Sequence, residues 1–282
     1  GGQKGKLGFC REPRGMRGIW LLLACMGAAI APRALADAHW DADAGLFLRR
    51  PAPAGGYPYR LYAPPRARAH GKLPLIVFLH GSGQNGDNNE DQIADGGNGA
   101  LQLLDAALRE HRPILFLAPQ SPQDYWVPAR VMAVIADVEK HWPVDRDRIV
   151  LTGLSSGATG DWDAAKAWPD RFAALVPMSG MTETAGLASI ARVPEWVFHA
   201  ADDDDTDVET GAGGAMVGSR AVVRALREAG GHPCYTEYLH GPVDPDPHVI
   251  WPQAYATPGL LDWMLAQRRG RAAHACPAAA PN

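Results

Sequence analysis

The pentapeptide Gly153-Leu154-Ser155-Ser156-Gly157 constrains the fold of this chain more than any other feature of its sequence. A strand-like run at 148–152 precedes it, and a run at 158–167 that is compatible with a helix follows it. A serine between a strand and a helix lies on a sharp turn, and flanking glycines remove the Cβ atoms that would collide there. The helix directs its first amides at the place where negative charge develops during acyl transfer. The sequence therefore predicts that Ser155 is a nucleophile on a strand–turn–helix unit.

Short apolar runs alternate with helical patterns along the rest of the chain. Runs without polar alternation indicate strands that are buried on both faces, and they occur at 73–79, 114–118, 149–151, 173–177 and 196–198. Further strands are expected at 57–62 and 234–239. Apolar residues at helical spacing occur at 101–108, 131–138, 222–226 and 260–265. This alternation predicts an α/β fold in which helices cover both faces of a mostly parallel central sheet.

In such a sheet, functional residues gather at the carboxyl ends of the strands. Those ends predict one rim that is built from five segments, at 80–86, 119–126, 153–157, 200–207 and after residue 239. The interval between residues 178 and 194, at about 15 residues, is too short for a large lid domain. We therefore expect an open site.

A serine hydroxyl becomes a nucleophile when an imidazole takes its proton and a carboxylate orients that imidazole. In strand–turn–helix sites, the acid and then the histidine follow the serine along the chain. The acid is expected in the aspartate run 202–205, where any of the four residues could serve. The histidines that come later are His232, His240, His248 and His274. We predict His248 as the base, because it lies in the loop that leads into the last helix, and His240 is the alternative.

Acyl transfer also needs amide donors that are aimed at the developing oxyanion. The N–H group of Ser156, directly after the nucleophile, is one predicted donor. The second is expected in the loop after an early strand, where we predict Ser82, with Gly83 as the alternative. Trp126 and Trp251 fall in loops at the same rim, where they either line the substrate pocket or pack at the bases of the loops.

Five parts of the chain match one family. They are residues 75–83 with 86–89, 118–120 with Trp126, 144–155, 196–199 with Asp203, and His248 with Trp251 and Tyr255. Together they resemble the secreted serine esterases of the α/β-hydrolase fold, in the group that contains polyhydroxybutyrate-depolymerase-like, feruloyl-esterase-like and related phospholipase/carboxylesterase proteins. The resemblance covers residues 57–267. It implies an α/β-hydrolase fold, and it assigns the catalytic roles to Ser155, Asp203 and His248.

The first 36 residues have the features of an export signal. A basic start precedes an apolar stretch at 19–30, and Ala34-Leu35-Ala36 is the small-x-small pattern after which signal peptidase cuts. The apolar run of about 12 residues is well below the roughly 20 that a membrane-spanning helix needs. We expect a signal peptide at about 16–36 that starts at Met16 and is cleaved after Ala36. The mature protein would then be secreted or periplasmic.

Beyond this segment we expect a catalytic domain at 37–270 and a C-terminal tail at 271–282. Without residues 1–36 the chain has 21 basic and 30 acidic side chains, a net charge of −9. A mildly acidic protein without a basic stripe binds nucleic acids and anionic membranes poorly. Two cysteines remain, Cys234 and Cys276. In an exported protein they could form a disulfide that ties the tail to the body, and the sequence leaves this pairing open.

These features predict a secreted carboxylic-ester hydrolase that acts through an acyl-serine intermediate on small-molecule or polymeric esters. Feruloyl, acetyl, polyhydroxyalkanoate and simple alkyl esters all remain open, because specificity depends on the geometry of loop side chains. A serine peptidase of the same fold is one alternative, and a non-catalytic exported binding protein is another. No metal or organic cofactor and no stable membrane insertion are implied, and the oligomeric state is not indicated.

Overall fold

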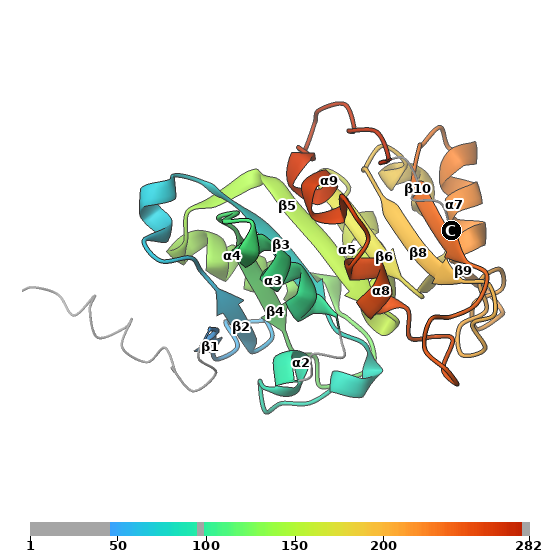
Figure 1. Ribbon diagram of the computed structural model, residues 1–282, viewed down its shortest axis with the longest axis horizontal. Helices are drawn as coiled ribbons and strands as arrows, with labels where there is room; N and C mark the ends of the chain where they lie inside the picture. The colour runs from blue at the N-terminus through green and yellow to red at the C-terminus, as the bar shows by residue number, and fades with distance from the viewer. Residues whose placement is uncertain (1–45, 95–98, 278–282) are drawn as a thin grey trace, which may run out of the picture. The chain divides into compact units, whose positions relative to one another are not determined.

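The central sheet has eight strands in the order β1-β2-β4-β3-β5-β6-β8-β10 (Figure 1). The computed structural model describes residues 46–94 and 99–277, which belong to one unit of the chain. The strands are β1 (Leu48–Arg50), β2 (Tyr59–Tyr62), β3 (Leu73–Leu79), β4 (Leu115–Pro119), β5 (Val144–Leu154), β6 (Ala174–Met178), β8 (Trp196–Ala200) and β10 (Cys234–Tyr238). The pairs β1–β2 and β2–β4 are antiparallel, and every other neighbouring pair is parallel. The predicted mostly parallel sheet is confirmed.

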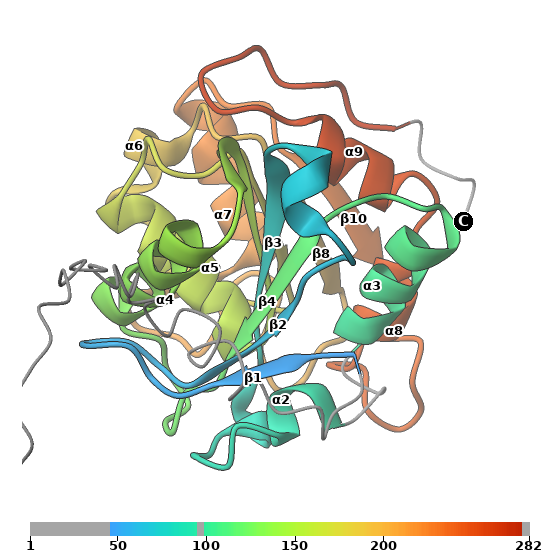
Figure 2. The ribbon, with the colours of Figure 1, turned by 90° about the vertical axis from the view of Figure 1, so that its left-hand side faces the viewer.

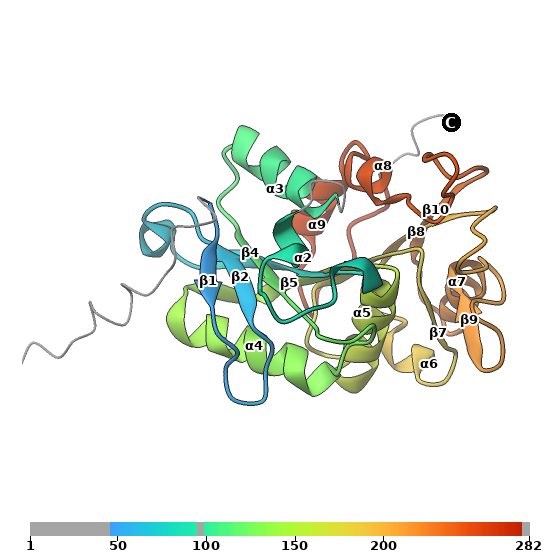
Figure 3. The same cartoon turned by 90° about the horizontal axis from the view of Figure 1, so that it is seen from below.

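Helices lie on both faces of this sheet, as Figure 2 and Figure 3 show. One face carries α4 (Pro128–His141), α5 (Ser156–Ala167), α6 (Leu187–Ile190) and α7 (Ser219–Glu228). The other carries α3 (Ala100–Arg109), α8 (Trp251–Tyr255) and α9 (Leu260–Ala266). The remaining short elements are η1 (Ala67–His70), η2 (Ser82–Gln84), α2 (Asp91–Ala94), β7 (Met181–Glu183) and β9 (Met216–Gly218).

Strand β3 shows why the inner strands are apolar throughout. Leu75, Val77 and Leu79 belong to the core beneath α4 and α5, whereas Ile76 and Phe78 belong to the core beneath α3 and α9. Successive side chains of a strand point to opposite faces, so a strand between two layers of helices needs apolar residues at every position. All seven residues of β3 are buried.

The interval between β6 and β8 holds two short elements. They are β7, which pairs antiparallel with β9, and the single helical turn of α6. Three strand residues and one helical turn are too few to form a lid domain, in agreement with the prediction.

The tail is fastened to the body of the protein by a disulfide between Cys234 of β10 and Cys276. The indole Nε1 of Trp263 in α9 donates to the carbonyl of His274 at 3.2 Å, and the amide of His274 donates to Oε1 of Gln267 at 3.0 Å. The pairing that the sequence left open is therefore present. The expected signal segment and its cleavage site after Ala36 lie outside the described residues. Among the described helices, none has the length and apolar character that crossing a membrane requires.

Candidate active site

Ser155 occupies the turn between β5 and α5 with φ 54° and ψ −120°, a conformation that side-chain-bearing residues rarely adopt. A Cβ atom on Gly153 would lie 2.4 Å from the carbonyl carbon of Gly157. A Cβ atom on Gly157 would lie 1.9 Å from the carbonyl oxygen of Leu79 in β3. Both glycines are therefore required by the close approach of α5 to β5 and β3. The amide of Ser155 donates to the carbonyl of Met178 at 2.9 Å, which fixes the turn against β6.

Ser155, His248 and Asp203 form one chain of hydrogen bonds. Nε2 of His248 is 3.0 Å from Oγ of Ser155, and Nδ1 of His248 is 2.7 Å from Oδ2 of Asp203. Because an ionised carboxylate only accepts hydrogen bonds, Nδ1 carries the proton and Nε2 is left to accept the serine proton. The histidine and the aspartate are 7% and 5% exposed. The three residues follow β5, β8 and β10, whose carboxyl ends share one edge of the sheet.

The loop after β10 is held in place through hydrogen bonds to the backbone groups of His248. Oγ of Ser179 donates to the carbonyl of His248 at 3.0 Å, and the amide of His248 donates to Oδ1 of Asp246 at 3.2 Å. Burial acts to lower the pKa of His248, but the hydrogen bond and charge of Asp203 outweigh it, and the charges of Asp205 and Asp246 add to them. The pKa of His248 is therefore raised above its ordinary value.

The four consecutive aspartates have different surroundings, and Asp203 is the one that is buried. Asp202 pairs with His240 at 3.1 Å, and the side chain of His240 is 87% exposed. Asp204 is exposed. Asp205 is 71% exposed, and its Oδ2 lies 3.4 Å from Nε2 of the triad histidine. The structure thus brings Asp203 to the predicted base, and it engages the alternative base, His240, outside the triad.

The carboxylate of Asp203 has partners on both oxygens. Oδ1 accepts the amides of Asp205 at 3.0 Å and Thr206 at 2.8 Å. Oδ2 lies 3.1 Å from Nε2 of His199, in addition to its contact with His248. Burial acts to raise the pKa of Asp203, but the hydrogen bonds from His199 and His248 hold it well below its usual range. The sequence reasoning assigned no role to His199, although a histidine near the carboxyl end of an apolar strand is a usable signal.

Ser82 and Ser156, the predicted oxyanion donors, lie together beside Ser155. Their Oγ atoms are 3.4 Å apart. A Cβ atom on Gly81 would lie 2.7 Å from the side chain of Leu154 and 3.3 Å from Cβ of Ser155, so the loop after β3 packs directly against the serine turn. This placement is compatible with two backbone amides that converge on one oxyanion.

His80 sets the direction of the backbone amide of Ser82. It is fully buried, its Nδ1 donates to the carbonyl of Gly81 at 2.8 Å, and its Nε2 accepts the amide of Ser121 at 2.9 Å. Burial lowers the pKa of His80 to about 4, so the ring is neutral near pH 7. Because the peptide group is planar and trans, fixing the carbonyl of Gly81 turns the N–H of Ser82 to the opposite side.

The two tryptophans have different roles in the structure. Trp126 is 5% exposed, its ring lies 4.8 Å from that of His80 and 5.2 Å from that of Tyr57, and its Nε1 donates to the carbonyl of His80. Of the two roles that the sequence left open, the structure shows Trp126 packed beneath the loop after β3, and a contact with substrate stays a prediction. Trp251 is partly exposed, and its ring stands edge-on to that of His248 at 5.6 Å. Its substrate-binding role stays a prediction.

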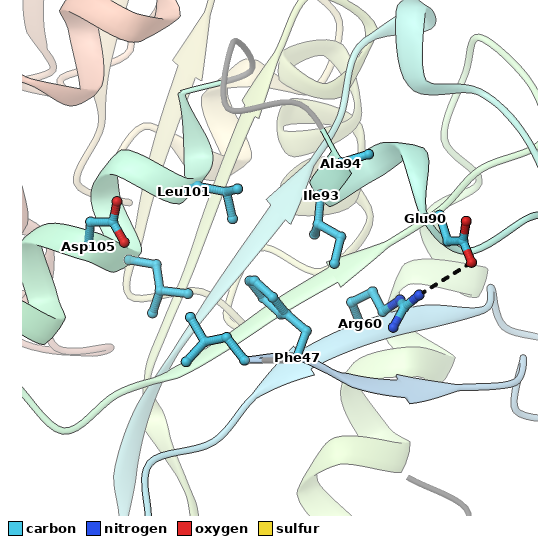
Figure 4. Close-up of a pocket in the computed structure, with 9 residues that line it drawn as sticks. Phe47, Arg60, Glu90, Ile93, Ala94, Leu101 and Asp105 are labelled. Atoms are coloured by element: carbon cyan, nitrogen blue, oxygen red, sulfur yellow. Dashed lines mark ion pairs between the residues drawn. The ribbon is translucent and has the colours of Figure 1, made fainter. Parts of the chain in front are cut away.

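A cavity of about 460 Å³ lies apart from these residues, between β1, β2, α2 and α3 (Figure 4). It has apolar walls that include Phe47 and Ile93, and Figure 4 shows Arg60 directed at Glu90, 3.9 Å away. None of the residues predicted for the triad or for the oxyanion hole is among the residues that line it. Across residues 46–94 and 99–277, the His, Cys, Asp and Glu side chains do not gather in threes that could hold a metal ion.

Comparison with solved structures places this geometry among known folds. A thermostable esterase matches with 32% identity and a TM-score of 0.70, over 80% of this chain and 64% of that chain. This chain thus spans less than two thirds of that esterase. The Pyrococcus horikoshii acylaminoacyl peptidase matches with 11% identity and a TM-score of 0.53, over 82% and 42% of the two chains. A ferulic acid esterase matches with 16% identity and a TM-score of 0.52, over 74% and 91%.

No protein-family model matches the chain, and no curated protein sequence matches it. The solved structures with identities of 16% and 11% show the fold alone, whereas the thermostable esterase is also similar in sequence. The order of the strands and the serine turn after β5 agree with this similarity. The chain has the α/β-hydrolase fold.

Proposed function

We propose that this protein is a serine hydrolase that cleaves carboxylic esters through an acyl-serine intermediate. The observation that carries the proposal is the hydrogen-bonded chain from Ser155 through His248 to Asp203, with contacts of 3.0 and 2.7 Å. A serine, an imidazole and a buried carboxylate in this order are the arrangement that activates a hydroxyl for attack on a carbonyl.

The geometry supports a two-step reaction. Nε2 of His248 takes the hydroxyl proton of Ser155 as Oγ attacks the ester carbonyl, and the amides of Ser82 and Ser156 stabilise the oxyanion. The imidazolium, paired with Asp203, then protonates the leaving alcohol as the C–O bond breaks. In the second step, His248 takes a proton from water as the water oxygen attacks the acyl-serine carbonyl, and the imidazolium then returns that proton to Oγ of Ser155 as the acyl–Oγ bond breaks and the carboxylic acid leaves. Each step returns the histidine to its starting state.

Esters are favoured as substrates by the sequence similarity to a thermostable esterase at 32% identity. The acylaminoacyl peptidase has only 11% identity, and this chain spans 42% of it, so that likeness does not favour a peptide substrate. The short interval between β6 and β8 supports an open site that could admit acyl groups on bulky or polymeric material. Feruloyl, acetyl, polyhydroxyalkanoate and alkyl esters are the candidate classes.

A panel of substrates tests the proposal. It contains p-nitrophenyl acetate, methyl ferulate, a polyhydroxybutyrate film and a peptide p-nitroanilide, and a fluorophosphonate serves as a probe of Ser155. We expect turnover of at least one ester, with the peptide anilide cleaved far more slowly. Cleavage of the peptide without ester turnover would make the protein a peptidase. An unlabelled Ser155 in the folded wild-type protein would favour the binding-protein alternative.

The pH dependence of ester turnover follows from the state of His248. The base must be neutral, so kcat/KM is expected to fall as the pH drops through the pKa of His248. Because Asp203 and the neighbouring carboxylates raise this pKa, the protonated, inactive form persists to a higher pH, and the midpoint should lie above 6.5. A profile from pH 5 to 9 measures it.

Asp205→Asn provides the comparison for this profile. Oδ2 of Asp205 lies 3.4 Å from Nε2 of His248, and its charge helps to raise the pKa of His248. Removing that charge should therefore move the midpoint of the pH profile downward. Asp204→Asn, at an exposed neighbour, is the matched control. A flat wild-type profile between pH 5 and 8 would count against His248 as the base.

We also propose that the protein is exported and cleaved after Ala36. The basic start, the apolar run and the Ala34-Leu35-Ala36 pattern support this, and so does the disulfide between Cys234 and Cys276, since such bonds persist in oxidising compartments. Mass spectrometry of the full chain after expression in a bacterial host should find Asp37 at the amino terminus of the exported protein. Ala36→Arg should block that cleavage, and an unprocessed wild-type chain retained in the cytoplasm would contradict the proposal.

A further inference from the structure

We infer that His199 is a positioning residue for the triad acid and that Ser219, at the start of α7, orients His199. The inference rests on the proposed function, because it concerns how the proposed acid, Asp203, is held. It adds two residues to the site that lie beyond the three members of the triad.

The contacts of the His199 ring define the directions of its hydrogen bonds. The residue is fully buried in β8, and its Nε2 lies 2.9 Å from the carbonyl of Thr206 and 3.1 Å from Oδ2 of Asp203. Both partners are acceptors, so Nε2 must carry a proton. On the opposite side, Nδ1 lies 2.7 Å from Oγ of Ser219. This short contact is a hydrogen bond between the ring and the hydroxyl of Ser219.

Ser219 is itself fixed by its surroundings. It is fully buried as the first residue of α7, and its Oγ lies 3.3 Å from the carbonyl of Gly180, beyond its shorter contact with His199. A Cβ atom on the preceding Gly218 would lie 2.1 Å from the carbonyl oxygen of Asp207, so this end of α7 packs tightly onto the acid loop. The serine hydroxyl therefore has little freedom to move away from the His199 ring.

These contacts give both carboxylate oxygens of Asp203 two hydrogen-bond partners each. Asp203 receives two backbone amides on Oδ1, and it receives His248 and His199 on Oδ2. When His248 becomes a cation, the carboxylate can neither rotate nor give up its charge, because the N–H of His199 holds the oxygen that faces Nδ1 of His248. The same hydrogen bond helps to keep the pKa of Asp203 low, which supports an ionised acid throughout the working range.

Substitutions of His199 with and without a donor test this role. His199→Phe keeps a planar ring but removes both nitrogen atoms, whereas His199→Gln can place an amide N–H near the position of Nε2. The readouts are the second-order rate of Ser155 labelling by a fluorophosphonate, kcat and KM for p-nitrophenyl acetate, and the Tm. The exposed His232→Gln is the matched control.

We expect His199→Phe to lower the labelling rate and kcat by about ten- to a hundredfold, the loss of one hydrogen bond to a charged group, with KM unchanged. His199→Gln should recover most of that loss. Ser219→Ala should have a smaller effect, and it should add nothing in the His199→Phe background, because both changes remove the same support. A folded His199→Phe protein labelled at the wild-type rate, a His199→Gln protein as impaired as His199→Phe, or additive effects of the two changes would each overturn the inference.

Labelling separates this inference from the proposed substrate class. If the wild-type protein is labelled but hydrolyses no ester, the substrate class fails, while the labelling rates of the variants still decide the role of His199. If His199→Phe does not fold, Ser219→Ala decides instead. It removes one hydroxyl on another element, and an undiminished labelling rate in that variant would then overturn the inference.

Discussion

Replacing Ser155 with alanine is expected to lower kcat/KM for p-nitrophenyl acetate by at least about 10⁴-fold, because the attacking atom is lost while binding and the oxyanion amides remain. A substitute nucleophile would have to be the hydroxyl of Ser82 or Ser156. Neither hydroxyl contacts His248 among the hydrogen bonds of the described residues. The variant should also resist fluorophosphonate labelling, which mass spectrometry of the intact protein measures.

The control for this prediction is Ser189→Ala. Ser189 is exposed on α6, and its Oγ donates to the carbonyl of Gly186 at 2.7 Å, so the same chemical change is made away from the triad. The Tm of both variants should stay close to that of the wild-type protein. Activity retained in a folded Ser155→Ala protein would remove the basis of the proposed reaction.

Replacing Glu195 with glutamine is expected to stabilise the protein at alkaline pH. Glu195 precedes β8 and is 1% exposed, and its Oε2 accepts the indole N–H of Trp162 at 2.9 Å. Asp161 of α5 is fully buried and interacts with it electrostatically. Neither carboxyl forms an ion pair with a basic side chain in the described part of the chain. Burial raises the pKa of Glu195 to about 8, and burial and then the charge of Glu195 raise the pKa of Asp161.

The sign of the effect follows from proton binding. Between the ordinary pKa of glutamate and about 8, the folded protein holds a proton on Glu195 that the unfolded chain has released, so stability falls as the pH rises through this window. The full loss across this window is on the order of 5 kcal/mol in the free energy of unfolding. Glutamine cannot ionise, and it retains an oxygen for the indole of Trp162. The variant should therefore match the wild-type protein near pH 4 and exceed it at pH 9.

Urea unfolding at pH 4, 7 and 9 measures this difference. Glu183→Gln, at an exposed glutamate of β7, is the matched control and should leave the pH dependence unchanged. Parallel stability curves for wild type and Glu195→Gln across these pH values would show that the buried carboxyl is not protonated in the folded state.

The inner strands of the sheet could be predicted because burial on both faces leaves an unbroken apolar run. The segment 73–79 is predicted and observed with the same bounds as β3. Strand β1 escaped prediction because it lies at the edge of the sheet and contains Arg49 and Arg50, which an edge strand tolerates. Strands β7 and β9 have three residues each and pair across a long stretch of chain, so they leave no local pattern.

The site residues divide in the same way. Ser155 has a local signature, and the position of His248 follows from the order of elements in the fold. Asp203 could be selected only by resemblance, because side chains of four adjacent aspartates diverge in directions that the loop backbone decides. Trp126 could equally line the pocket or pack at the base of a loop, since an indole serves both roles, and its burial shows the packing without testing a contact with substrate. A histidine in an apolar strand, such as His199, is hard to distinguish from a core residue without its partners.

The outermost position of β10 has a consequence for how the protein matures. This strand pairs with β8 at the end of the sheet, it supplies the loop that carries His248, and Cys234 ties it to the tail. Ser155 and His248 are 93 positions apart, so the serine gains its partner only after the carboxyl-terminal third of the chain has docked. Under the proposed function, the serine therefore becomes reactive late in folding, and a nascent or truncated chain that lacks the final strand would not react with esters or with a fluorophosphonate.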